Sequence, residues 1–112
     1  IAHPPLFGMG AVNVTVSREE VDRLESTRFG AGVVSGQPLT QRALEVVRRI
    51  HTRSQGTYPI IGVGGLMTPD DVRAMLDAGA ALVQIYTGYI YNGPGYVREI
   101  CRALLEKKAA EN

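Results

Sequence analysis

The sequence predicts an α/β fold in which three parallel strands alternate with helices. Three short apolar segments, 10–15, 59–63 and 81–86, are typical of strands, and each is followed by a loop and a segment with the 3.6-residue period of a helix. Strands that alternate with helices pair in parallel through right-handed crossovers. A doubly wound sheet and a (β/α)8 barrel both satisfy this requirement.

The first unit runs from strand 10–15 to a helix predicted over about 40–53. Between them, the charged segment 17–28 predicts a solvated turn or a short helix, and 29–38 is a glycine-rich loop. Thr40 is expected to be the N-cap of the helix. Three apolar residues mark the inward face of the helix: Leu44, Val47 and Ile50.

The second unit has the clearest helix boundaries. Strand 59–63 leads into the glycine turn 62–65, and Thr68 and Pro69 then predict an N-cap and a first helical residue, with two acidic residues following them. Gly79 is expected just past the end of this helix, because a positive φ costs little in a residue without a Cβ.

The third unit contains strand 81–86, a short aromatic segment over 87–91, a break at 92–95 and an amphipathic helix over about 96–108. Three units of this size amount to roughly three-eighths of a barrel that typically needs ~250 residues. A free three-stranded parallel sheet exposes two edges and an uncovered face, which natural proteins rarely tolerate. We therefore expect either more chain or self-association to cover these surfaces.

The run 59–65, Pro-Ile-Ile-Gly-Val-Gly-Gly, predicts an anion site. A parallel strand that ends in glycines presents bare backbone N–H groups beyond its carboxyl end, and in barrels of alternating strand and helix that place commonly holds a phosphate. We therefore expect a phosphorylated ligand. The alternative is that the glycines form only a tight turn between strand and helix.

Composition narrows the class of protein. With 112 residues, 45% of them hydrophobic, and a formal net charge of +1, the chain is expected to be one globular domain at most and no nucleic-acid partner is expected. Cys101 is the single cysteine, which favours a reducing, cytoplasmic setting and predicts a buried or half-buried thiol. No residues have metal-ligand spacing, and no apolar run approaches the ~20 residues of a membrane span.

Four motifs, in order and spacing, resemble the carboxyl-terminal part of the quinone-linked (class 2) dihydroorotate dehydrogenases. Together the motifs are highly specific, whereas each alone is weak. The motifs are Val12-Asn13-Val14-Thr15 before Ser17-Arg18, Gly32-Val33-Val34-Ser35-Gly36-Gln37-Pro38-Leu39, Ile60-Ile61-Gly62-Val63-Gly64-Gly65, and Ala78-Gly79-Ala80-Ala81-Leu82-Val83-Gln84-Ile85-Tyr86-Thr87 with Gly93-Pro94.

The resemblance implies the last three units of a (β/α)8 barrel that binds flavin mononucleotide (FMN) and oxidises dihydroorotate to orotate. A quinone would accept the electrons, and the parent enzyme would lie in the cytoplasm or peripherally on the inner membrane. Asn13 would hydrogen-bond the pyrimidine. The residues implied around the FMN phosphate and ribityl chain are Ser35, Gly36, Val63, Gly64, Gly65, Tyr86 and Thr87. Tyr86 and Asn13 also have ordinary interpretations, as a strand-end aromatic and a turn residue.

The chain departs from the family pattern at its substrate end. Val12 and Val14 replace hydroxyl residues, and Val33 replaces a glycine, so the loop with Ser35 is expected to be displaced. The family's general base, a serine in this class, belongs to an earlier strand that these residues do not include. We therefore expect no catalytic residue here and no turnover by this chain alone. The alternative is a non-catalytic fragment that folds or self-assembles and at most binds phosphate.

Overall fold

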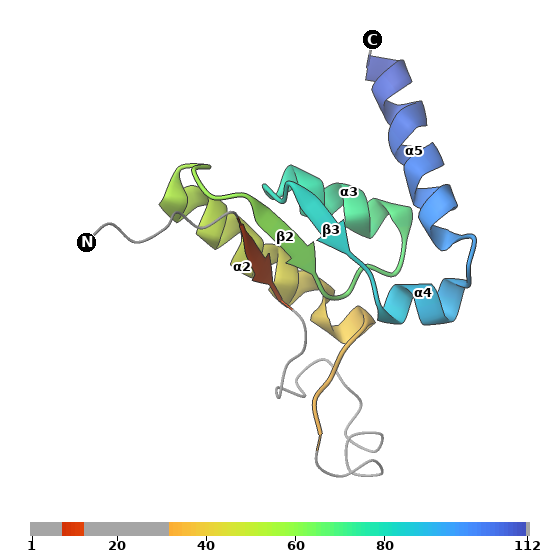
Figure 1. The fold of residues 1–112 in the computed structure, drawn as a ribbon, viewed down its shortest axis with the longest axis horizontal. Coiled ribbons are helices and arrows are strands. Elements are labelled where there is room, and N and C mark those ends of the chain that lie inside the picture. The colour runs from red at the N-terminus through yellow and green to blue at the C-terminus, as the bar shows by residue number, and fades with distance from the viewer. Residues whose placement is uncertain (1–7, 13–31, 112) are drawn as a thin grey trace.

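The computed structural model describes residues 8–12 and 32–111, and their elements alternate between strand and helix as expected (Figure 1). The elements are β1 (Met9–Ala11), the 3-10 helix η1 (Gln37–Leu39), α2 (Thr40–Ser54), β2 (Ile60–Val63), α3 (Pro69–Asp77), β3 (Leu82–Gln84), α4 (Thr87–Asn92) and α5 (Tyr96–Glu111).

The three strands form one parallel sheet in the order β1-β2-β3. Met9 pairs with Ile60, and Ile61 pairs with Leu82. Helix α2 packs against β1 and β2, and α3 packs against β3, so both helices cover the same face of the sheet (Figure 1). The prediction of parallel strands joined by helical crossovers is confirmed.

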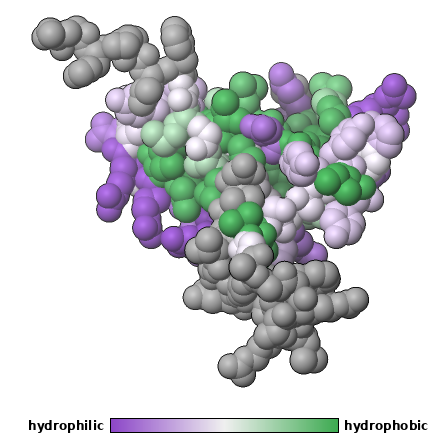
Figure 2. Space-filling model, turned by 60° about the horizontal axis from the view of Figure 1, so that its bottom comes forward, coloured by the Kyte–Doolittle hydropathy of each residue, from purple (hydrophilic) through white to green (hydrophobic). Residues whose placement is uncertain are grey.

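The two faces of the sheet differ in exposure. Ile60 is fully buried on the face covered by the helices. Because successive side chains in a strand point to opposite faces, Ile61 and its partner Leu82 lie on the other face, and Leu82 is 64% exposed. Figure 2 shows the molecule turned so that the bottom of Figure 1 comes forward. In this view apolar side chains gather over the middle of the molecule. The sheet therefore has an open, partly apolar face.

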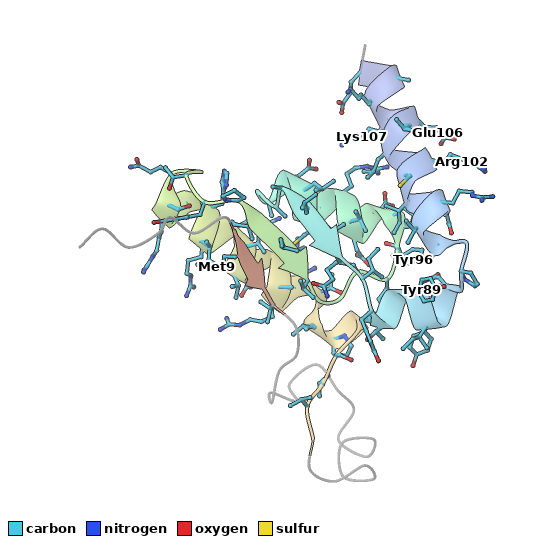
Figure 3. The ribbon with its side chains drawn as sticks, in the orientation of Figure 1. Met9, Tyr89, Tyr96, Arg102, Glu106 and Lys107 are labelled. Atoms are coloured by element: carbon cyan, nitrogen blue, oxygen red, sulfur yellow. The ribbon has the colours of Figure 1, made fainter. Side chains whose placement is uncertain are left out.

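The core lies between the sheet and the helices. Among the described residues, Tyr96 at the start of α5 is the largest fully buried side chain, and it lies beside α4 (Figure 3). The predicted inward face of α2 is confirmed, since Leu44 and Val47 are buried and Ile50 packs against the same cluster. The core cluster consists of Ala43, Leu44, Val47, Ile60, Leu66, Val72, Met75, Ala78, Ala80, Tyr96 and Ile100.

Helix α3 begins where the sequence predicts. The Thr68 hydroxyl accepts a hydrogen bond from Asp71 N at 3.2 Å, and the Asp71 carboxylate accepts from Thr68 N at 3.0 Å, which forms a capping box. Pro69 is the first helical residue, and Gly79 follows the C-cap with φ +119°. These contacts fix the direction in which the chain leaves β2.

Thr40 is not an N-cap, contrary to the sequence prediction. The N-cap of α2 is Leu39, and Thr40 is the first helical residue. Its hydroxyl has one hydrogen and lies within donating distance of two carbonyl oxygens, Gly65 O at 2.6 Å and Gln37 O at 2.9 Å, of which Gly65 O is the nearer. The glycine turn after β2 lies directly over the start of α2, so the hydroxyl donates to this turn instead of accepting from its own helix.

Three other expectations need correction. Strand β3 is shorter than 81–86, and the aromatic segment after it forms the helix α4. Strand β1 begins one residue earlier than expected, and the predicted strand residues 13–15 lie outside the described ranges. Cys101 is exposed, because its neighbour Ile100 takes the buried position on α5.

The described ranges contain no helix that is both long and apolar enough to cross a membrane. Within the same residues, no group of three or more His, Cys, Asp or Glu side chains is placed to hold a metal ion.

Candidate functional site

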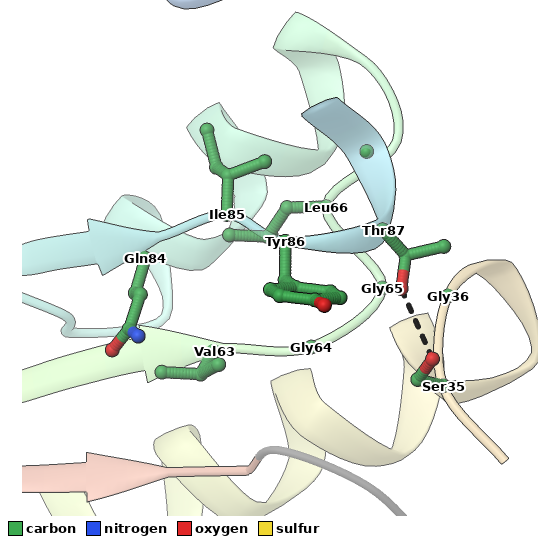
Figure 4. Close-up of a pocket in the computed structure, with 11 residues that line it drawn as sticks. Ser35, Gly36, Val63, Gly64, Gly65, Leu66, Gln84, Ile85, Tyr86 and Thr87 are labelled. Carbon is green, nitrogen blue, oxygen red and sulfur yellow. Dashed lines mark hydrogen bonds between the residues drawn. The ribbon is translucent and has the colours of Figure 1, made fainter. Parts of the chain in front are cut away.

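A pocket of about 240 Å³ lies beyond the carboxyl ends of β2 and β3 (Figure 4). It includes all seven residues that the family resemblance implies around the FMN phosphate and ribityl chain. Those seven come from three segments of the chain, before η1, at and just after the end of β2, and after β3, which parallel pairing places at one end of the sheet. The lining residues are Ser35, Gly36, Val63, Gly64, Gly65, Leu66, Gln84, Ile85, Tyr86, Thr87 and Gly88.

Two hydroxyl groups meet at one side of the pocket. Ser35 Oγ and Thr87 Oγ1 are 3.0 Å apart and share a hydrogen bond, although the residues are 52 positions apart in sequence (Figure 4). Thr87 is the first residue of α4, and Ser35 precedes η1. Either hydroxyl is able to donate to an anion in the pocket while accepting from the other.

Glycines allow the backbone segments around the pocket to approach closely. Gly64 (φ +110°) lies against Leu39, where a Cβ would come within 2.7 Å of Leu39 Cδ2. Gly65 (φ +70°) lies against the backbone N and Cα of Thr40, so a Cβ there would overlap main-chain atoms. The turn after β2 is thereby held on the start of α2 at positions where only glycine fits.

The pocket is lined by uncharged residues and offers hydrogen-bond donors to an anion. None of the residues that line it carries a charged side chain. No main-chain hydrogen bond among the described residues uses the N–H groups of Gly64 or Gly65. These N–H groups, together with the two hydroxyls, are the kind of donors that hold a phosphate without a basic side chain.

Tyr86 lies at the mouth of the pocket, with 74% of its surface exposed. Its ring extends from the end of β3 over the turn that contains Gly64 (Figure 4). This placement makes Tyr86 a lining residue and not a core aromatic. A role in binding FMN remains a prediction.

Val33 does not need the backbone conformation that its replacement of a glycine predicts. It has no positive φ, and its side chain is 60% exposed. The positive φ of this loop falls instead at Gly36 (φ +84°), and Ser35 remains in the pocket. Asn13 and Val14 lie outside the described residues, so the substrate role of Asn13 stays a prediction.

Four lining residues are not among the site residues predicted from the sequence: Leu66, Gln84, Ile85 and Gly88. The sequence contains a signal that could have found Gln84. Side chains two residues apart in a strand point to the same face, so the predicted strand 81–86 places Gln84 on the same face as Tyr86. Leu66 and Gly88 simply extend the motifs that contain Gly65 and Thr87.

Tyr96 does not line the pocket but forms a hydrogen bond with a residue that does. Its hydroxyl donates to Leu66 O at 3.0 Å, and the residue is only 1% exposed. Burial is the main cause that raises the pKa of Tyr96 to about 12, and the nearby carboxylates of Asp71 and Glu99 contribute the rest of this rise. At neutral pH the hydroxyl is therefore protonated and remains a donor.

The fold and the pocket define a segment of a (β/α)8 barrel, with three parallel strands whose carboxyl ends surround one pocket. The model of the dihydroorotate dehydrogenase family matches residues 2–107, and the chain belongs to that family.

Relatives and solved structures agree with this assignment. The chain is 51% identical over 106 residues to the dihydroorotate dehydrogenase (quinone) of Thermosynechococcus vestitus, covering 89% of this chain and 29% of the relative. It is 45% identical over 102 residues to that of Christiangramia forsetii, covering 91% of this chain and 29% of the relative. A crystal structure of DHODH from Eimeria tenella with ferulenol superposes with a TM-score of 0.83 at 30% identity, over 96% of this chain and 28% of that one. The expected family and fold class are confirmed, and the chain spans less than a third of these relatives.

Proposed function

We propose that this chain forms the FMN-phosphate site of a quinone-linked dihydroorotate dehydrogenase. The observation that supports the proposal most strongly is the convergence of Ser35, Gly64 and Thr87 on one pocket from three separate segments. The relatives also support the proposal, because both are named dihydroorotate dehydrogenase (quinone).

The pocket fits the phosphate end of FMN better than its ring. Its volume of about 240 Å³ is many times the ~10–15 Å³ that one water molecule needs on the same measure, which leaves room for a phosphate and the start of its chain. The glycine N–H groups and the two hydroxyls would hold the phosphate oxygens. Bound FMN supplies the hydride acceptor for the oxidation of dihydroorotate to orotate, and the electrons would pass to a quinone.

We also propose that the three strands work together with parts of the enzyme outside residues 1–112. The open face of the sheet, with Leu82 64% exposed, would be covered by the remainder of a barrel or by self-association. Asn13 would bind the pyrimidine. We propose that residues 1–112 alone have no turnover, because the base and the flavin-ring contacts would come from other strands. The parent enzyme would be cytoplasmic or peripheral on the inner membrane.

A comparison of FMN with riboflavin tests the phosphate role. In the full gene product that contains these residues, Ser35→Ala and Thr87→Val are each expected to weaken FMN binding about 10-fold or more, because a hydrogen bond to a charged group contributes ~1.5–3 kcal/mol. Riboflavin lacks the phosphate, so its affinity should change less than about twofold. Quenching of flavin fluorescence measures both affinities.

Thr57→Val is the matched control, because the Thr57 hydroxyl is exposed and donates only to Ser54 O. We expect this variant to bind both flavins as the unmodified protein does. Equal losses for FMN and riboflavin in the Ser35 and Thr87 variants, or no loss for either, would contradict the phosphate assignment.

A further inference from the structure

Two side chains outside the pocket donate hydrogen bonds to the loop that continues from Gly64 and Gly65. The Tyr96 hydroxyl donates to Leu66 O at 3.0 Å, and the Asn92 amide donates to Met67 O at 2.9 Å. Neither donor lines the pocket. They therefore hold the loop without lining the space that a ligand would occupy.

Asn92 also joins the two walls of the pocket. Its Nδ2 donates both to Met67 O, in the loop after β2, and to Gly88 O at 2.8 Å, in the helix after β3. Gly88 packs so closely on the carbonyl of Leu66 that a Cβ would overlap it, and the Tyr96 ring covers the same glycine. One amide group and one ring thus fix the separation between the two walls.

The N–H groups of the same loop are held as well. Met67 N and Thr68 N both donate to Asp71 Oδ2 at 3.0 Å. With Leu66 O and Met67 O bound by Tyr96 and Asn92, the backbone from 66 to 68 has partners on both its donor and its acceptor sides. Little freedom is left for the preceding glycines to turn their N–H groups away from the pocket.

We propose that Asn92 and Tyr96 are positioning residues that set the pocket's preference for a phosphate monoester over the matching uncharged alcohol. This inference rests on the proposed function and adds the residues that give the site its selectivity. The pocket has no basic side chain, so binding of a phosphate depends on N–H and hydroxyl donors placed on both walls. Such donors have to be held within about 0.5 Å of the productive geometry by the groups behind them.

Tyr96→Phe and Asn92→Ala test the inference in the full gene product. Tyr96→Phe removes one neutral hydrogen bond and Asn92→Ala removes two, so FMN affinity is expected to fall about 5-fold or more in each variant, while riboflavin affinity changes less than about twofold. Tyr96→Phe keeps the buried ring, and Asn92→Ala removes the bridge without touching the core. If one variant fails to fold, the other still decides the outcome.

Tyr91→Phe is the matched control, because Tyr91 is 78% exposed on α4 and its hydroxyl should not affect either flavin. A purely structural role for Tyr96 and Asn92 would weaken FMN and riboflavin equally, and that result would overturn this inference alone, as would unchanged FMN affinity. If the unmodified protein itself fails to prefer FMN over riboflavin, the proposed function is overturned and this inference with it.

Discussion

Replacement of Gly65 by alanine is expected to lower the free energy of unfolding by about 3 kcal/mol or more. Two costs add at this position. The residue has φ +70°, which costs an L-residue roughly 1–2 kcal/mol. The new Cβ would also overlap the backbone N and Cα of Thr40, and main-chain atoms at the start of a packed helix are unable to move aside without a further ~1–3 kcal/mol. Urea unfolding followed by circular dichroism measures the loss.

Gly93→Ala separates the two costs. Gly93 has a similar φ of +82°, but a Cβ there has open space around it. We expect this control to lose only the conformational part, about 1–3 kcal/mol, because φ +82° with ψ −175° is a conformation that essentially only glycine adopts. Losses of the same size in both variants would mean that the close approach of the turn to Thr40 does not exist in solution.

Gly88→Ala is expected to weaken FMN binding more than 10-fold and to destabilise the fold by about 1–3 kcal/mol. Alanine is the better helix former by ~1 kcal/mol, so α4 alone would gain stability from the change. The Cβ, however, would overlap Leu66 O and come within 3.0 Å of Tyr96 Cε1, which pushes α4 away from the loop after β2. The two walls of the pocket would separate, and FMN titration together with thermal unfolding measures both effects.

Gly10→Ala is the control for this variant. Gly10 lies within β1, and a Cβ there meets nothing within 4 Å. We expect its stability and flavin affinity to stay near those of the unmodified protein. If Gly88→Ala bound FMN as tightly as Gly10→Ala does, the separation of the walls would not control the site.

The sequence is sufficient to predict elements whose signals are local. The start of α3 is an example, since Thr68, Pro69 and Asp71 lie within four residues and form their capping contacts with one another. The gathering of Ser35, Gly64 and Thr87 is also predictable, because parallel strands bring their carboxyl ends to one edge of a sheet.

Elements that depend on distant contacts are not predictable in this way. Helix α4 has the sequence Thr-Gly-Tyr-Ile-Tyr-Asn, which has low helix propensity. Its contacts with the rest of the protein are distant in sequence, since Asn92 donates to a carbonyl 25 positions away and Tyr96, which follows it, to one 30 positions away. The role of Thr40 is missed for the same reason, because its acceptor Gly65 lies 25 positions away.

The most direct measurement is backbone amide NMR of the full gene product, titrated separately with FMN and with riboflavin. We predict that FMN shifts the amide resonances of Gly64, Gly65 and Thr87, and that riboflavin leaves these three nearly unchanged. Equal shifts with both flavins, or phosphate-dependent shifts confined to other parts of the protein, would contradict a phosphate site at the carboxyl ends of β2 and β3.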